Sequence, residues 1–254
     1  MYKEAVVLEI EGISIVGWLY LPEGESRYPT VCLCHGIPSG NPPDPGDGGY
    51  PALAERICRE GFAVLIFNFR GTADSGGNLD LLGWTRDLQA VIDYLRDLPE
   101  VDKSRLSLVG FSGGAAVSAY VAAGDSRVSS VALCSCPAEF TLLTRTDNPL
   151  SIIDRFRNIG AIRDEDFPPS VEEWLNSFRL IRPIDYIARI APRPVLLVHG
   201  NSDKTVDISH AHRLYAKAGE PKQLEIIAGA GHRLRREDRA IEAVLTWLKS
   251  NYYC

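Results

Sequence analysis

The stretch LSLVGFSGGAAVSAY, residues 106–120, decides the fold of this chain. An apolar run typical of a strand leads into the motif Gly110-Phe111-Ser112-Gly113-Gly114, and small residues typical of a helix follow it. A serine in the pattern G-x-S-x-G between a strand and a helix sits on a sharp, strained turn that projects its hydroxyl clear of the sheet. The stretch therefore predicts that Ser112 is a nucleophile, with the Gly113 amide at a helix N-terminus beside it.

Short apolar runs alternate with helical stretches on both sides of this unit. After a hairpin of residues 5–10 and 13–21, the predicted strands cover residues 30–34, 63–68, 106–110, 128–134, 195–199 and 223–227. The predicted helices cover residues 50–60, 84–98, 113–123, 210–218 and 239–251. Strands that are apolar along their whole length are typical of a mostly parallel sheet with helices on both faces. The sequence thus predicts the α/β class.

Residues 137–183 interrupt this alternation and are too long for a bare loop in a compact domain. Asn148-Pro149 is a helix start signal. Ser170 and Glu173 match a capping box ahead of a second apolar pattern. We expect residues 1–136 and 184–254 to form the core, and residues 137–183 to form a small inserted helical cap.

Composition excludes several classes of protein. The 254 residues carry a formal net charge of −6 and no stripe of Lys and Arg, which argues against a nucleic-acid partner. No apolar run approaches the roughly 20 residues of a membrane span, and the first residues lack the apolar segment of a signal peptide. Six cysteines without a CxxC pair predict buried, reduced thiols in the cytoplasm rather than a metal site. No motif predicts a cofactor.

A serine hydroxyl is a weak nucleophile without a base, and the candidate base is His232. It follows Gly229-Ala230-Gly231, which allows a tight turn over the strand ends after residues 224–227. His35 and His199 end predicted strands, so we expect structural roles for them. His210 and His212 lie on a predicted helix, where we expect them to be exposed.

The base needs an acid that fixes its orientation, and the candidate is Asp203. It lies just beyond the strand of residues 195–199, with Asp207 as the competing carboxylate. The order Ser112, Asp203, His232 along the chain is the order of the α/β-hydrolase triad.

An oxyanion intermediate needs two donors, and backbone amides are the candidates. Gly113 supplies one. Gly36 permits an unusual backbone angle after the strand of residues 30–34, so we expect the Ile37 amide to supply the other. Donors of this kind contribute about 3–4 kcal/mol each in the transition state.

These motifs give the chain a family resemblance. His35-Gly36, residues 110–114, and Asp203 with Gly231-His232 resemble motifs of the α/β-hydrolase superfamily, and residues 67–77 resemble a loop of its esterase, monoacylglycerol-lipase-like and serine-peptidase-like branches. The resemblance covers nearly the whole chain. It implies an eight-stranded sheet whose second strand is antiparallel, and a cap between strands six and seven. Thr72-Ala73-Asp74 and the long proline-rich loop of residues 38–50 depart from the usual pattern.

Together these features predict a serine hydrolase that cleaves carboxylic esters of small to medium acyl groups through an acyl-enzyme. A thioesterase or a small-peptide or amide hydrolase could use the same triad. A non-catalytic ligand receptor on this fold is the third alternative, disfavoured because no triad member is missing. The expected partner is a small-molecule ester, and the sequence does not predict an oligomeric state.

Overall fold

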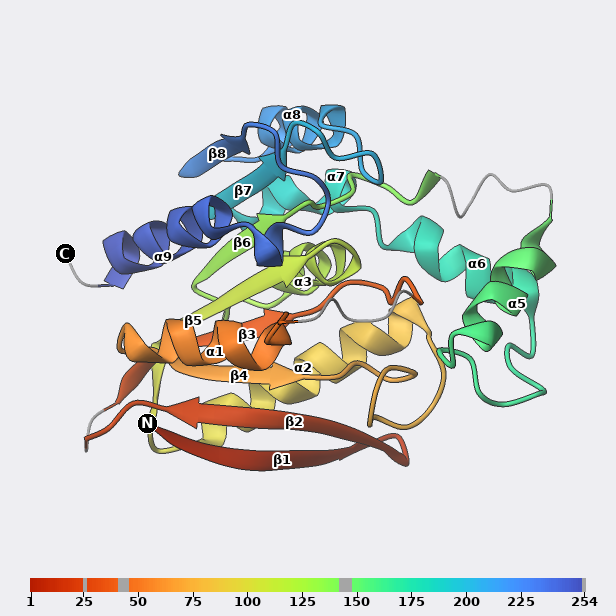
Figure 1. The fold of residues 1–254 in the computed structure, drawn as a ribbon, viewed down its shortest axis with the longest axis horizontal. Helices are drawn as coiled ribbons and strands as arrows, with labels where there is room; N and C mark the ends of the chain where they lie inside the picture. Colours follow the sequence, from red (N-terminus) through yellow and green to blue (C-terminus); the bar gives the residue numbers. More distant parts are fainter. Residues whose placement is uncertain (25–26, 41–45, 142–147, 253–254) are drawn as a thin grey trace.

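The computed structural model describes residues 1–24, 27–40, 46–141 and 148–252, which form one eight-stranded sheet (Figure 1). The strand order is β1-β2-β4-β3-β5-β6-β7-β8. The hairpin β1–β2 and the pair β2–β4 are antiparallel, and all other neighbours are parallel. The strands are β1 Tyr2–Ile10, β2 Ile13–Leu21, β3 Tyr28–Cys34, β4 Ala63–Phe67, β5 Val101–Phe111, β6 Ser130–Cys134, β7 Val195–Gly200 and β8 Lys222–Ile227. The predicted α/β-hydrolase sheet, with its antiparallel second strand, is confirmed.

Helices cover both faces of the sheet. Among the described residues, the α-helices are α1 Gly49–Arg59, α2 Leu81–Asp97, α3 Gly113–Gly124, α5 Pro149–Asn158, α6 Val171–Leu180, α7 Pro183–Tyr186, α8 Ser209–Lys217 and α9 Asp238–Tyr252, with the 3₁₀ turns η1 Ile187–Ile190 and η2 Leu234–Arg236. Helices α1 and α9 pack on one face, and α2 and α3 pack on the other (Figure 1). In the described part of the chain, no helix combines the length and apolar content needed to cross a membrane.

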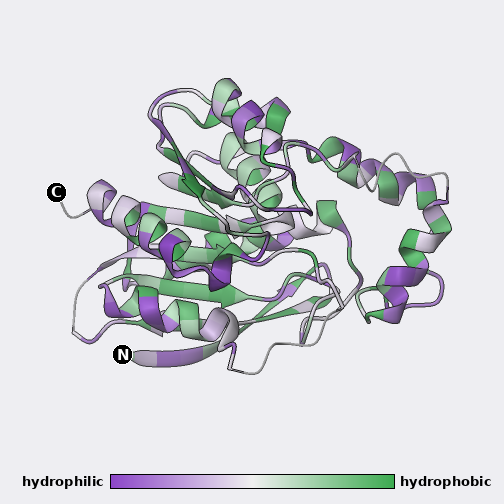
Figure 2. Cartoon of the chain, turned by 45° about the horizontal axis from the view of Figure 1, so that its top comes forward, coloured by the Kyte–Doolittle hydropathy of each residue, from purple (hydrophilic) through white to green (hydrophobic). Residues whose placement is uncertain are grey.

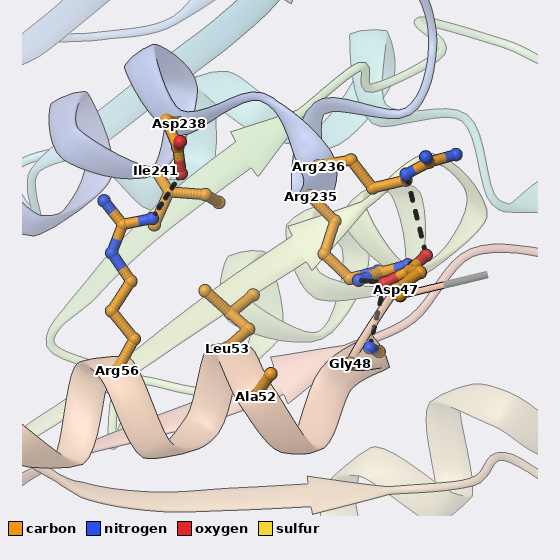
Figure 3. A pocket seen from close by; sticks show the side chains of 11 residues that line it. Asp47, Gly48, Ala52, Leu53, Arg56, Arg235, Arg236, Asp238 and Ile241 are labelled. Atoms are coloured by element: carbon orange, nitrogen blue, oxygen red, sulfur yellow. Dashed lines mark hydrogen bonds and ion pairs between the residues drawn. The ribbon is translucent and has the colours of Figure 1, made fainter. Parts of the chain in front are cut away.

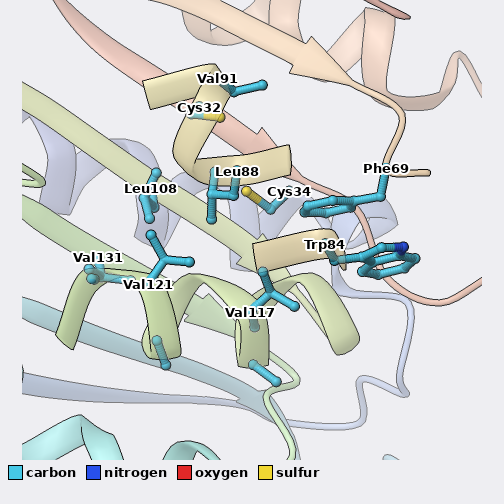
Figure 4. Close-up of a cluster of buried hydrophobic side chains, with 14 of the residues drawn as sticks. Cys32, Cys34, Phe69, Trp84, Leu88, Val91, Leu108, Val117, Val121 and Val131 are labelled. Atoms are coloured by element: carbon cyan, nitrogen blue, oxygen red, sulfur yellow. The ribbon is translucent and has the colours of Figure 1, made fainter. Parts of the chain in front are cut away.

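Two apolar layers result from the alternation of side chains along the strands. Cys32 and Cys34 point into the layer beneath α2 and α3, where Trp84 and Leu88 pack (Figure 4). Val31 and its neighbours on the opposite face pack against α1 and α9. Figure 2 shows the apolar residues concentrated along the strands. Because both faces are covered, the carboxyl ends of the parallel strands are left to carry polar groups.

The described part of the insertion contains helices α5 and α6 at the positions that its start signals predict. The Asn148 side chain accepts from the Ser151 amide, and the Ser170 hydroxyl accepts from the Glu173 amide at 3.2 Å. Helices α5 and α6 lie on the side of the sheet where the parallel strands end (Figure 1). That residues 137–183 behave as a separate cap stays a prediction.

The insertion is attached to the loop that follows β4. The Asn78 side-chain oxygen accepts from the Arg163 amide at 2.7 Å, and the Arg163 guanidinium donates to the carbonyls of Ala73 and Ser75. The Trp174 indole donates to the Leu79 carbonyl at 2.8 Å. These bonds hold the insertion beside residues 72–79, which border the site described next.

Candidate active site

Ser112 occupies a strained turn between β5 and α3. Its φ is 52° and its ψ is −120°, a conformation that costs a residue with a side chain about 1–3 kcal/mol. The glycines of the motif allow the close approach of α3 that the turn requires. A Cβ on Gly110 would lie 2.5 Å from the Ala115 Cα, and a Cβ on Gly114 would lie 2.3 Å from the His35 carbonyl oxygen. The turn therefore presents the serine hydroxyl at the end of β5, as the motif predicts.

The side chains of Ser112, His232 and Asp203 form one hydrogen-bonded chain. The His232 Nε2 lies 3.0 Å from the Ser112 Oγ, and the Nδ1 lies 2.8 Å from the Asp203 Oδ2. The other carboxylate oxygen accepts from the amides of Thr205 at 2.8 Å and Val206 at 2.9 Å. Because a carboxylate can only accept, Nδ1 carries the proton, and Nε2 is free to accept the serine proton. The structure thus brings together the three predicted residues.

The Asp203 carboxylate stays ionised although its side chain is fully buried. Burial alone would raise its pKa, but the hydrogen bonds from His232 and from the amides of Val206 and Thr205 outweigh it, so the pKa lies below its usual value. The buried His199 ring lies beneath the same loop, with its Nε2 2.8 Å from the Val206 carbonyl oxygen and 3.5 Å from the Asp203 Oδ2. His199 therefore has the structural role expected of it, and it supports the turn that carries the carboxylate.

The competing carboxylate and the remaining histidines lie elsewhere. Asp207 is exposed and accepts from the Ser209 amide at the start of α8. His212 is exposed as expected. The expectation for His210 was wrong, since the ring is half-buried and its Nδ1 accepts from the Ala138 amide at 3.0 Å. The reason is that α8 packs against the start of the insertion, a contact between distant segments.

The two predicted oxyanion donors lie beside Ser112. A Cβ on Gly36 would lie 3.0 Å from the Ser112 Cβ, so only glycine fits there without displacing its neighbour. A Cβ on Gly113 would lie 3.4 Å from the Ile37 amide nitrogen, which shows how near the β3 loop comes to the first turn of α3. The Ile37 amide thus lies near the first turn of α3, and the role of the two amides as oxyanion donors stays a prediction.

His35 orients the peptide unit that carries the Ile37 amide. Its Nδ1 lies 2.8 Å from the Gly36 carbonyl oxygen, which belongs to the same peptide unit as that amide. Its Nε2 accepts from the Phe69 amide at 3.1 Å and lies 3.1 Å from the Thr72 hydroxyl. Burial lowers the pKa of His35, which favours the neutral ring that both bonds require. The sequence predicts a structural role for His35 but not these contacts, because Phe69 and Thr72 follow a different strand, β4.

A pocket of about 520 Å³ opens above Ser112 and His232. Its apolar lining includes Ile37, Tyr50 and Phe111. The described residues of the insertion do not line this pocket. Their aromatic rings pack on one another, as in the edge-on contacts of Trp174 with Phe156 and Phe178. Within the described residues, no group of His, Cys, Asp and Glu is arranged to hold a metal.

Comparison with known proteins identifies a family and a set of relatives. A model of the prolyl oligopeptidase family matches residues 52–252. The uncharacterized protein YfhR of Escherichia coli O157:H7 is 28% identical over 228 residues, which are 87% of this chain and 70% of YfhR. The uncharacterized protein Rv2307c of Mycobacterium tuberculosis is 29% identical over 236 residues, 91% of this chain and 72% of that protein.

Solved structures share the fold along almost the whole chain. The α/β hydrolase GrgF from Penicillium sp. sh18 superimposes with a TM-score of 0.77 at 18% identity, covering 98% of this chain and 99% of that one. Est1E from Butyrivibrio proteoclasticus with bound ferulic acid gives 0.73 at 22% identity, covering 97% of each chain. An acetyl xylan esterase from Paenibacillus sp. R4 gives 0.69 at 19% identity, covering 98% and 88%. These likenesses establish the α/β-hydrolase fold.

Proposed function

The chain belongs to the prolyl oligopeptidase family, and on this premise we propose that it is a serine hydrolase that cleaves carboxylic esters of small to medium acyl groups. The observation that carries the proposal is the hydrogen-bonded chain from the Ser112 hydroxyl through the His232 ring to the Asp203 carboxylate. A base aligned with a serine on a strained strand-to-helix turn is the arrangement that activates a hydroxyl for attack on a carbonyl.

The proposed reaction uses these residues in two halves. The Ser112 Oγ attacks the ester carbonyl while His232 Nε2 takes the hydroxyl proton, and the amides of Ile37 and Gly113 donate to the resulting oxyanion. His232 then gives the proton to the departing alkoxide, which leaves as an alcohol. Water attacks the acyl-serine with His232 as base, and the acid is released as Ser112 regains its proton. Asp203 holds the ring and stabilises the imidazolium throughout.

The size of the pocket supports esters of modest length. A volume of about 520 Å³ lies within the range of small-molecule sites, roughly 300–1,000 Å³. The aromatic side chains that could have formed an acyl tunnel in the insertion are engaged in packing. Two structural neighbours are an acetyl xylan esterase and an enzyme solved with ferulic acid, which agrees with an ester substrate.

The main alternative is a small-peptide or amide hydrolase, which the family match favours. An enzyme that binds a peptide amine requires a free carboxylate near the serine. Asp47 is a carboxylate of the pocket lining, but it is paired with the Arg235 guanidinium, and this weakens the alternative. A thioesterase would use the same three residues, so substrate tests must distinguish it.

Initial rates on p-nitrophenyl esters from acetate to palmitate test the proposal, with wild type and Ser112→Ala compared side by side. We expect serine-dependent turnover with an optimum at short to medium chains. Acyl p-nitroanilides and acyl-CoA thioesters of the same acyl groups provide the comparison of leaving groups. Faster serine-dependent turnover of the anilides or thioesters would contradict the ester assignment, and equal ester rates in both proteins would contradict the serine mechanism.

We also propose that the protein resides in the cytoplasm. Five cysteines lie within the described residues, and all five are buried and free. Burial raises the pKa of the Cys134 thiol to about 12, so it packs as a small apolar group. Thiol titration of the protein, purified from its own cells without reductant and then denatured, should find six reactive thiols. A lower count would contradict a reducing compartment.

A further inference from the structure

A second pocket, of about 330 Å³, shares part of its lining with the pocket that contains Ser112. Figure 3 shows the residues that line this second pocket. Asp47, Gly49 and Arg235 line both pockets. We propose that the Asp47–Arg235 ion pair is the wall between the two pockets and thereby limits the length of substrate that the enzyme accepts. The inference rests on the proposed function and names a specificity determinant of the same site.

The ion pair is well fixed in its position. The Arg235 Nη1 lies 2.7 Å from the Asp47 Oδ1, and Nη2 lies 2.5 Å from Oδ2, which makes the contact bidentate. The Gly49 amide donates to the same carboxylate at 2.9 Å, and the Arg236 Nε lies 3.7 Å from it. The two side chains are only 12% and 19% exposed. A bidentate pair of this kind has a defined geometry and can serve as a rigid boundary.

The pair lies beside the aromatic part of the catalytic pocket's lining. Arg235 follows His232 by three positions, and its guanidinium lies 5.2 Å from the centre of the Tyr50 ring. The Tyr50 ring in turn packs edge-on against Phe111, at 5.7 Å between centroids. A substrate arm that runs from Ser112 along these two rings therefore reaches the Asp47–Arg235 pair and stops there.

The space beyond the pair can receive a longer arm. Its lining includes the side chains of Ala52, Leu53 and Ile241, which provide apolar surface (Figure 3). The charges on its far side are already paired, since the Arg56 guanidinium donates to the Asp238 carboxylate at 2.8 Å. Removal of the wall would thus join to the catalytic pocket a space whose lining combines these apolar side chains with the ion-paired Arg56 and Asp238.

The test compares Asp47→Ala/Arg235→Ala with wild type and with Arg56→Ala. Both partners are removed together because one charge left alone would itself perturb the site. The matched control, Arg56→Ala, removes an ion pair that lines the second pocket and leaves the Asp47–Arg235 pair intact. The readouts are kcat/KM for p-nitrophenyl alkanoates and for alkyl butyrates of increasing length. A second readout is the rate at which p-nitrophenyl alkylphosphonates of increasing length modify Ser112, measured by intact mass.

We expect the double variant to favour long substrates in at least one series. The ratio of long-chain to short-chain rates should rise by about tenfold or more, the value of one or two accommodated methylenes. Arg56→Ala should keep the wild-type profile. Arg235→Ala alone leaves Asp47 bonded to the Gly49 amide and near Arg236, so it provides a second variant with the same expected direction if the double variant does not fold.

Two outcomes would overturn the proposal. If the folded variants that lack the ion pair keep the wild-type dependence of kcat/KM on chain length, the pair does not limit substrate length. An equal loss on short and long substrates would show that the pair positions His232 instead. Failure of the proposed serine mechanism is distinguishable, because wild type would then escape modification at Ser112 by phosphonates of every length, and failure of the ester assignment alone would appear as faster turnover of anilides or thioesters.

Discussion

Replacement of Asp203 by asparagine tests the proposed triad with almost no change in shape. In the native site, Oδ2 accepts from His232, and Oδ1 accepts from the amides of Thr205 and Val206. An asparagine side chain has only one acceptor oxygen, so it can satisfy only one of these two sides. The outcome depends on which side keeps the oxygen.

The structure favours the arrangement that disables the base. If the new NH₂ group faced the amides of Thr205 and Val206, these two N–H donors would lose their acceptor, at about 1–3 kcal/mol each. The oxygen therefore stays with the amides, and NH₂ faces His232. The ring must then present an unprotonated Nδ1, which leaves the proton on Nε2, where it blocks transfer from Ser112. A penalty of roughly 2–6 kcal/mol on the productive arrangement corresponds to a factor of about 30 to 10⁴ in population.

We expect kcat of Asp203→Asn on p-nitrophenyl acetate to fall by about 10³–10⁴, since stabilisation of the imidazolium is lost as well. Asp207→Asn is the matched control, because this exposed carboxylate accepts from the Ser209 amide at the start of α8, and its kcat should match wild type. Circular dichroism and Tm verify that both variants fold. A fall of less than about tenfold in Asp203→Asn, or an equal fall in Asp207→Asn, would refute the assigned role.

Three further outcomes follow from the local geometry. Gly110→Ala should not yield folded protein, because its Cβ would lie 2.5 Å from the Ala115 Cα, whereas Gly124→Ala should be neutral because nothing lies within 4 Å; thermal unfolding compares them. Ser112→Gly should be more stable in urea than Ser112→Ala by about 1 kcal/mol or more, because glycine relieves the strain at φ 52°; equal stabilities would contradict that strain. The Asp47 ion pair should stabilise the fold above the unfolded carboxyl pKa of about 4 and lose this effect as the pH falls, because Arg235 holds the pKa of Asp47 below its usual value. The Tm difference between wild type and Asp47→Asn should therefore shrink from pH 6 to pH 2.5, and a constant difference would contradict the reasoning.

The fold and the placement of the three central side chains could be predicted from local patterns. Strands that are apolar along their length identify a covered parallel sheet, and the carboxyl ends of such strands meet at one edge. Ser112, Asp203 and His232 each follow a predicted strand at a turn, so the fold brings them together. The glycines around Ser112 also indicate this placement, because they lie where backbone segments approach too closely for a side chain.

The supporting contacts could not be predicted because they join segments that have no pattern in common. His35 contacts the Gly36 carbonyl through Nδ1 and accepts from the Phe69 amide through Nε2, and Phe69 follows a different strand. His210 was expected in solvent because helical periodicity does not reveal that the insertion begins beside α8. The Asp47–Arg235 pair likewise joins residues far apart in the chain, each of which is an ordinary polar loop residue in isolation.

The most direct test of the serine mechanism is mass spectrometry of the protein quenched early in its reaction with p-nitrophenyl acetate. An acyl-enzyme mechanism should give an acetylated peptide that contains Ser112, together with a burst of p-nitrophenol, and Ser112→Ala should give neither. Ester turnover without acetylation of Ser112, or a burst that persists in Ser112→Ala, would contradict the mechanism.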